Sequence, residues 1–451
     1  MTDRLILKNV RIFDVNQSVF NDEQNVRIEK GIITGIDRFP VDEPSSEHVV
    51  DCQGKYVIPG LWECHAHISE YAAEDPEYRN RILSYYPQYP DISWDTYVQG
   101  RLQAFLDHGI THIRDVGGPL NSLSTLKQLI ENGKYSGPEI CYAGPMLEKP
   151  PLYWQSKNTR QPGYTEPVET KKDVDIIIER LINGGASLVK TFNKFDREFF
   201  EYLVSTAGEY QLPVTHDPGE ALYHQIPMDY AMQQGIRCFE HAKAALPVIL
   251  KTEWAREHDN FIQSADSEKR REFFEKVLIH QEEAIARDRL DMLCRTMIDQ
   301  NVCYCPTLWT LSSLRMEYKN EAPNEREARR RKLNEAYGRI LRLIVETMAS
   351  HAVKILVGHD SCSPGGNVEE MEFLEQWGVA PSEIIKGTTC YPAQWLGVND
   401  RYGEIRESMA ADLVILDQNP LLKISNIRTV HAVLHRGKWM PVNQGDNLPK
   451  E

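Results

Sequence analysis

The chain has 451 residues, 41% of them hydrophobic and 26% charged, with a formal net charge of −15. This composition is ordinary for a globular protein, and the length suits one large domain with a smaller companion. The negative charge argues against a nucleic-acid partner, because phosphate binding needs a basic surface, and the longest apolar runs fall short of the roughly 20 residues of a membrane helix.

Both ends of the chain are predicted to form short strands. Residues 5–13 alternate between apolar and polar, and comparable runs occur near the other end at 412–417 and 430–438. Short strands cannot cover their own apolar face and need a partner sheet. We therefore expect residues 1–58 and 398–451 to form one small β-sandwich domain.

Between these ends, residues 59–397 alternate eight times between a strand pattern and a helix pattern. Strands that alternate with helices of this length pair in parallel, and eight repeats close a (β/α)8 TIM-like barrel. The predicted strands are 61–67, 111–116, 139–144, 187–192, 212–216, 236–241, 302–308 and 354–360.

Two connections, residues 246–300 and 311–352, are long, charged and helical. They could form a scaffold face, a subunit contact in a homo-oligomer, or a lid over the strand ends. The nine cysteines are an odd number, and several lie in apolar runs. We expect buried free thiols, a reducing compartment and, with no signal-peptide pattern at the start, a cytoplasmic location.

Polar residues stand at or beside the ends of the predicted barrel strands, where a (β/α)8 barrel keeps its chemistry. His65 and His67 are two residues apart, so in a strand both imidazoles point the same way. Such a pair is weak evidence for metal binding by itself. It gains weight because His216 and His241 end two later predicted strands and Asp360 ends the last one. Asp115, Lys190 and His359 also lie at or beside the ends of predicted strands.

Lys190 cannot ligate a cation as an ammonium, because it then has no lone pair. Its neutral amine can react with carbon dioxide to give a carbamate, an anionic ligand suited to bridging two metals. The alternative is an ion pair with a nearby carboxylate. Asp360 could act as a metal ligand and proton carrier, or only as a strand cap. Arg114 and Asp115 are expected to form an internal ion pair.

These residues resemble those of the amidohydrolase superfamily along nearly the whole chain. The similarity is strongest to the prolidase-like, imidazolonepropionase-related branch, which includes Xaa-Pro dipeptidases. The segments that carry it are 58–67 (IPGLWECHAH), 109–118 (GITHIRDVGG), 143–146 (AGPM), 239–242 (FEHA), 392–397 (PAQWLG) and 411–420 (ADLVILDQNP).

The resemblance implies a centre of two divalent metals, usually zinc, although imidazole and carboxylate ligands also suit manganese, cobalt or iron. His65, His67 and Asp360 would hold the more buried metal. His216 and His241 would hold the outer one. Lys190, modified to N6-carboxylysine, and a hydroxide would bridge them.

Two loops depart from the family pattern and would line the substrate pocket. Residues 147–154 replace a Gly-Gly-His stretch, and residues 217–227 differ from the usual run. Tyr153 and His224 are the candidate substrate contacts in these loops.

The expected function is hydrolysis of an amide bond in a small peptide or N-acyl amino acid. The bridging hydroxide would attack the carbonyl, and catalytic Asp360 would pass the proton to the departing nitrogen. The same centre could instead hydrolyse cyclic amides, lactones or organophosphates. A metal-free scaffold protein is the alternative outside catalysis.

Overall fold

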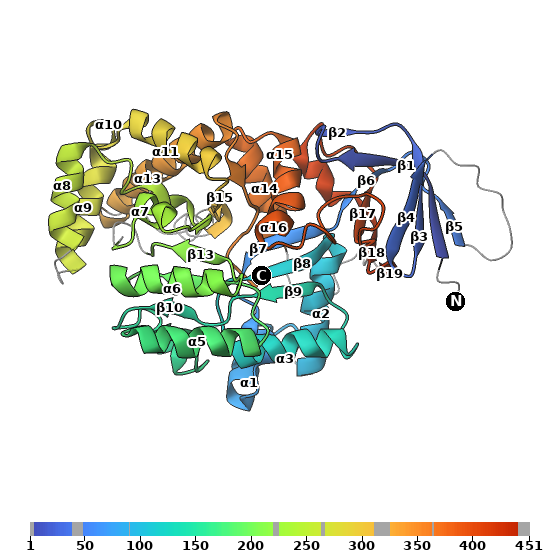
Figure 1. The fold of residues 1–451 in the computed structure, drawn as a ribbon, viewed down its shortest axis with the longest axis horizontal. Helices are drawn as coiled ribbons and strands as arrows, with labels where there is room; N and C mark the ends of the chain where they lie inside the picture. Colours follow the sequence, from blue (N-terminus) through green and yellow to red (C-terminus); the bar gives the residue numbers. More distant parts are fainter. Residues whose placement is uncertain are drawn as a thin grey trace.

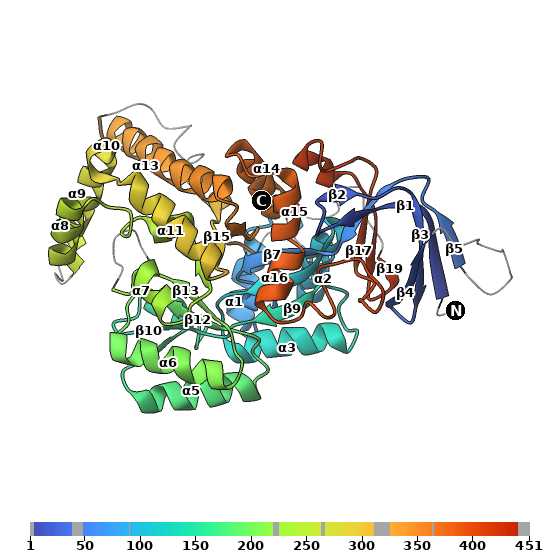
Figure 2. The same ribbon diagram turned by 45° about the horizontal axis from the view of Figure 1, so that its top comes forward.

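The computed structural model describes residues 4–37, 48–89, 91–219, 225–262, 267–310, 325–362 and 365–440. In both ribbon views, strands β1, β3, β4 and β5 lie at one end of the molecule and helices α8 and α9 at the other (Figures 1 and 2). A region of parallel strands and helices occupies the space between them. No helix among the described residues has an apolar stretch long enough to cross a bilayer.

The first sheet joins the two ends of the chain. Its main path runs β19-β18-β17-β6-β1-β3-β4, with β2 and β5 paired to β1. The connection between the ends is antiparallel pairing of β17 with β6, which sets Val414 opposite Ile58. Leu7, Val26 and Leu413 share one buried core. Strands from both ends of the chain therefore share one sheet.

The nine strands of this sheet are β1 (Arg4–Asp14), β2 (Val19–Phe20), β3 (Gln24–Glu29), β4 (Ile32–Asp37), β5 (His48–Asp51), β6 (Tyr56–Pro59), β17 (Leu413–Leu416), β18 (Val430–His435) and β19 (Lys438–Met440).

A parallel strand occurs at each of the eight positions predicted for the central region. The ten strands there form two parallel sheets, β7-β8-β9 and β11-β10-β12-β13-β14-β15-β16. They are β7 (Leu61–Ala66), β8 (Ile110–Asp115), β9 (Glu139–Tyr142), β10 (Met146–Glu148), β11 (Thr165–Pro167), β12 (Val189–Phe192), β13 (Val214–Asp217), β14 (Cys238–Glu240), β15 (Cys303–Cys305) and β16 (Lys354–Ile355).

Backbone hydrogen bonds connect these two sheets at two places. The Ser187 N–H donates to the carbonyl of Tyr142 at 2.8 Å, next to β12 and β9. At the other edge, the Cys64 N–H in β7 donates to the carbonyl of Val357 at 2.9 Å. Ala66 and Ser361 form an isolated parallel bridge nearby. The end of β7 and the segment after β16 thus lie side by side.

Helices follow most of the central strands and pack on their outer faces (Figure 1). They are α1 (Pro76–Ser84), α2 (Trp94–Asp107), α3 (Leu120–Glu131), α4 (Gln155–Asn158), α5 (Lys171–Asn183), α6 (Arg197–Glu209), α7 (Met228–Gln233), α8 (Thr252–Ile262), α9 (Ser267–Ile279), α10 (Gln281–Ala284), α11 (Arg287–Asp299), α13 (Glu325–Ser350), α14 (Gly366–Gln376), α15 (Pro381–Gly387) and α16 (Cys390–Trp395).

Helix α5 shows how the sequence sets these boundaries. Thr170 and Asp173 form a capping box, in which the Asp173 N–H donates to Thr170 Oγ1 at 3.1 Å and the Thr170 N–H donates to the Asp173 carboxylate at 2.8 Å. Val174, Ile178 and Leu181 repeat at helical spacing and are buried. The helix therefore starts at a fixed residue and presents one apolar stripe to the sheet.

The two long connections contain helices, as predicted. Residues 246–300 carry α8 to α11, and α13 packs against α9 and α11 (Figure 2). Residues 311–324 of the second connection lie outside the described residues. All nine cysteines are free thiols and eight of them are buried, which confirms the expected packing role.

Candidate metal centre

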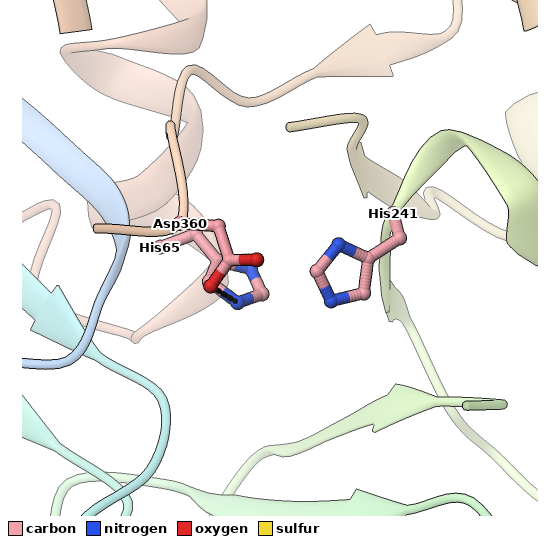
Figure 3. A group of neighbouring side chains, drawn as sticks. All are labelled: His65, His241 and Asp360. Carbon is pink, nitrogen blue, oxygen red and sulfur yellow. Dashed lines mark ion pairs between the residues drawn. The ribbon is translucent and has the colours of Figure 1, made fainter. Parts of the chain in front are cut away.

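Side chains from several strand ends meet in one place. His65 and His67 come from the end of β7, Lys190 from β12, His241 from the residue after β14, and Asp360 from the segment after β16. His65 and Asp360 lie together, and the His241 ring faces them (Figure 3). The ring centroids of His65 and His241 are 4.8 Å apart.

His65 is fully buried and oriented by a carboxylate. Its Nδ1 lies 2.7 Å from Oε2 of Glu240, so Nδ1 carries the proton and Nε2 keeps the lone pair. Nε2 lies 3.5 Å from Oδ1 of Asp360 and has no hydrogen-bond partner among the described residues. Burial, together with the positive charge of Lys190, lowers the pKa of His65 to about 4. The imidazole is therefore neutral at pH 7 and able to bind a metal.

His67 is oriented in the same way by a backbone carbonyl. Its Nδ1 lies 2.7 Å from the carbonyl oxygen of Gly117, which can only accept, so Nδ1–H donates. Its Nε2 faces Oδ1 of Asp360 at 3.3 Å. Both imidazoles of the His-x-His pair thus present Nε2 to the same carboxylate.

Asp360 and His241 both adopt left-handed backbone conformations, with φ values of 58° and 69°. Such angles are unfavourable for residues other than glycine and persist where surrounding bonds impose them. The Asp360 N–H donates to the His65 carbonyl and the His241 N–H to the Cys305 carbonyl, each at 2.8 Å. Burial opposes ionisation of Asp360, but His65 and His67 hold the pKa of its carboxyl below the usual range.

Glu240 and Arg114 form a fully buried support beneath this group. Arg114 Nη2 donates to both carboxylate oxygens of Glu240, at 2.8 and 3.0 Å. The predicted ion pair between Arg114 and Asp115 is therefore wrong. Asp115 instead accepts the N–H groups of Ile68 and Gly117 at 2.6 and 3.0 Å, which holds the backbone around His67.

His241 and Lys190 converge on the carboxylate of Asp217, a residue that was not among the candidates predicted from the sequence. Asp217 Oδ2 lies 3.0 Å from His241 Nε2 and 3.4 Å from Lys190 Nζ. Lys190 and Asp217 are only 1% and 2% exposed. His241 Nδ1 lies 2.7 Å from Thr307 Oγ1, which leaves its Nε2 directed at Asp217.

His216 does not join this group. Its Nδ1 lies 2.9 Å from Thr191 Oγ1 and its Nε2 lies 2.9 Å from the carbonyl oxygen of Ile226. The ring packs against Phe200 of α6, with 5.2 Å between centroids. The structure thus directs His216 toward the surrounding helices.

His359 belongs to a buried hydrogen-bond network around Glu63. Its Nδ1 lies 2.5 Å from Glu63 Oε2, and Glu63 also accepts the backbone N–H groups of His65 and His359. This network ties β7 to the segment after β16, and so fixes His65 relative to Asp360.

Of the predicted substrate contacts, Tyr153 lies near the surface and His224 lies outside the described residues. Tyr153 is 43% exposed and its ring packs edge-on against Phe192, at the end of the strand that carries Lys190. Lys157, which was not among the candidates predicted from the sequence, lies near His67 through the Tyr164 ring. Its Nζ is 3.9 Å from the centroid of Tyr164, and the Tyr164 centroid is 6.0 Å from the His67 ring.

Asp217 and Thr215 are two residues apart on β13 and therefore share one face of the strand. Because Thr215 pairs with Lys190, this face is the one that carries Lys190. Choosing between His216 and Asp217 needs the register of β13 against β12, which the sequence does not display. Lys157 lies on a four-residue helix in an irregular stretch, where no periodic signal exists.

Part of the chain matches a known protein family. Residues 263–440 match the model of the amidohydrolase family. Curated relatives include a dihydroorotase of Trichlorobacter lovleyi, 33% identical over 82 residues, and the ochratoxinase of Aspergillus niger, 31% identical over 98 residues. These alignments span 18% and 21% of this chain, and only 18% and 20% of the relatives' own length.

The structural likeness extends over the whole chain. A Xaa-Pro dipeptidase with bound methionine superimposes with a TM-score of 0.69 at 18% identity, covering 97% of this chain and 99% of that one. The Aspergillus niger ochratoxinase structure gives a TM-score of 0.68 at 18% identity, covering 97% and 95%. The family match over residues 263–440 and the fold shared with these solved structures agree with the resemblance in the sequence.

Proposed function

We propose that this protein is a metal-dependent hydrolase that cleaves an amide bond in a small peptide or an N-acyl amino acid. The observation that carries the proposal is the buried Nε2 of His65, which lacks a hydrogen-bond partner among the described residues. Potential ligand atoms of His241 and Asp360 lie close to it. A buried polar atom without a partner is unfavourable, and a bound cation would satisfy it.

The residues fit divalent cations. His65 and His67 each have Nδ1–H bonded to an acceptor, which is the arrangement that orients metal-binding imidazoles. His65, His67 and Asp360 would hold the first cation, and His241 with carboxylated Lys190 would contribute to the second. Imidazole and carboxylate ligands suit Zn²⁺, our first choice.

The charges around Lys190 bear on its modification. As an ammonium, Lys190 pairs with Asp217 at 3.4 Å, which is the simpler alternative to a carbamate. As a carbamate, it would place a second anion beside the buried Asp217 carboxylate. Two such anions require a cation between them, so modification of Lys190 and occupancy of the second site should depend on each other.

The chain's own residues supply positioning and proton transfer. Divalent cations bound here would activate water at neutral pH and polarise the substrate carbonyl. Asp360 is ionised, and its side chain remains 23% exposed, so it can accept a proton from the attacking water and deliver it to the departing nitrogen. Its left-handed backbone and the hydrogen bond to His65 hold the carboxylate in place for both steps.

We further propose that the two parallel sheets close into one (β/α)8 barrel spanning residues 59–397, with the β-domain formed by 1–58 and 398–451. The hydrogen bonds from Ser187 to Tyr142 and from Cys64 to Val357, which join the two sheets at both ends of β7-β8-β9, support closure. In such a barrel the strand ends face one mouth, which agrees with the meeting of candidate ligands from the ends of four strands, β7, β12, β14 and β16.

The choice of an amide substrate rests on the relatives. Structures of the same fold include proteins named Xaa-Pro dipeptidase, prolidase, ochratoxinase and phenylurea hydrolase B. At 15–20% identity these names indicate a class of reaction, and the residues around the centre would set the substrate.

The test is metal analysis of the purified full-length protein followed by assays on dipeptides, N-acyl amino acids, lactones and phosphoesters. Zinc and bicarbonate in the growth medium supply both cofactors. Metal-dependent release of amino acids from the first two groups supports the proposal. Turnover of lactones or phosphoesters alone would favour the alternative substrates, and metal-replete protein inert on all four classes contradicts a hydrolytic function.

A further inference from the structure

The register between β12 and β13 determines which side chains share the face of Lys190. The two strands are parallel and pair Lys190 with Thr215, Thr191 with His216, and Phe192 with Asp217. Paired residues in a parallel sheet point to the same side, and alternate residues along a strand point to opposite sides. Asp217 therefore lies on the side of Lys190, and His216 lies on the other.

Contacts on each side agree with this register. On the inner side, the Thr215 hydroxyl hydrogen-bonds to Glu240, which also holds His65. On the outer side, His216 packs against Phe200 and Phe239. A shift of one residue would be needed to exchange the two positions, and it would reverse every side chain of β13.

Hydrogen bonds within the fold occupy both ring nitrogens of His216. The Ile226 carbonyl can only accept, so Nε2 of His216 carries the proton and donates to it at 2.9 Å. In a neutral imidazole the remaining lone pair is on Nδ1, which faces the Thr191 hydroxyl at 2.9 Å. Both nitrogens are thus engaged, and the ring is fully buried.

Asp217 has the opposite properties. Its Oδ1 accepts the Gly219 N–H at 2.8 Å, which fixes the carboxylate plane. Its Oδ2 is directed at His241 Nε2 and Lys190 Nζ, at 3.0 and 3.4 Å. The His241 ring in turn lies 4.8 Å from the ring of His65, whose Nε2 has no partner among the described residues.

We propose that Asp217, rather than His216, is the β13 ligand of the second divalent cation, together with His241 and Lys190. This inference rests on the proposed function, because it assumes that the centre holds metal. It predicts a second site with one imidazole and otherwise oxygen ligands. Carboxylate oxygens suit Mn²⁺ better than imidazoles do, so this site should accept Mn²⁺ more readily than the site of His65 and His67.

The first experiment compares the metal content of Asp217→Asn and His216→Asn in the full-length protein, reconstituted with zinc and bicarbonate and then dialysed. Asp217→Asn should lose about half of the metal bound by the wild type, since only the second site is affected. His216→Asn should retain the wild-type content. The reverse result, with metal lost only in His216→Asn, would overturn the inference while leaving the proposed hydrolase intact.

Because His216 is buried, its replacement could unfold the protein, and a measurement on the wild type avoids this problem. X-ray absorption of the zinc-loaded wild type reports the imidazoles bound per metal. A spectrum that fits three zinc-bound imidazoles per protein, the number supplied by His65, His67 and His241, supports the inference. A spectrum that needs a fourth imidazole contradicts it. If the reconstituted wild type binds no metal at all, the proposed function itself fails, which is a distinct outcome.

Discussion

The Nδ1 atom of His65 lies 2.7 Å from Oε2 of Glu240, and both side chains are fully buried. Arg114 holds the same carboxylate, so the orientation of His65 depends on an ion pair that does not touch the substrate region. Burial opposes ionisation of Glu240, but Arg114 and His65 hold the pKa of its carboxyl below the usual range. Glu240 is therefore a positioning residue for the candidate metal centre.

Replacing Glu240 with Gln should weaken metal binding. The amide lacks the negative charge that fixes the His65 tautomer, and loss of such an orienting partner typically reduces metal affinity about 10–100-fold. Competition with a fluorescent zinc chelator measures this change directly. Glu282→Gln, at an exposed position, is the matched control. Unchanged zinc affinity in Glu240→Gln would show that His65 does not depend on this carboxylate.

The sequence was sufficient to predict the parts of the site that local patterns encode. His65 and His67 share a strand face because of period two, and the alternation of strands and helices placed Lys190, His241 and Asp360 at strand ends. The structure brings these five residues together as expected.

Other features depend on contacts between distant segments. The pairing of Arg114 with Glu240 joins β8 to β14, and nothing near Arg114 in the sequence distinguishes Glu240 from Asp115. His216 and Asp217 are adjacent, and only the register of β13 against β12 separates their roles. A one-residue difference in register reverses the side-chain faces, which is why a strand read in isolation favoured the histidine.

Lys190→Ala should lose metal and activity, with partial recovery in the presence of short carboxylic acids such as acetate. These acids would supply the oxygen ligands that the carbamate provides. Metal content and peptide hydrolysis, each measured with and without acetate, test this expectation. Lys172→Ala, on the exposed side of α5, is the control and should behave as the wild type. Full metal content in Lys190→Ala without acetate would contradict the bridging role.

Lys157 is expected to bind an anionic group of the substrate. Its ammonium lies over the Tyr164 ring beside His67, and burial lowers the pKa of Lys157 while Glu70, Asp360 and Asp115 oppose that change. A charge-assisted hydrogen bond to a substrate carboxylate contributes about 1.5–3 kcal/mol, so Lys157→Met should raise KM about 10–100-fold.

The specificity of this effect separates it from a structural defect. Lys157→Met should change kcat little, and Lys157→Arg should restore much of the affinity. For substrates with a C-terminal carboxamide, Lys157→Met should not raise KM. Lys149→Met, which removes a surface lysine paired with Asp196, is the control. An equal rise in KM for carboxylate and carboxamide substrates would exclude an anion-binding role.

His112 should make the stability of the fold depend on pH. It lies between Trp62, stacked at 4.4 Å, and Asp412, the residue before β17, and burial lowers the pKa of His112 to about 4. The unfolded chain binds this proton near pH 6.5. Between pH 4 and pH 6.5 the unfolded state therefore binds more protons than the folded state. The contribution of His112 to the free energy of unfolding is complete above pH 6.5 and is lost as the pH falls toward 4. The loss is about 3 kcal/mol at most. Urea unfolding measures the free energy of unfolding at pH 7 and at pH 4.5. The decrease between the two pH values should be smaller for His112→Gln than for the wild type or for the exposed-site control His280→Gln. Equal decreases in all three proteins would assign the acid sensitivity to other groups.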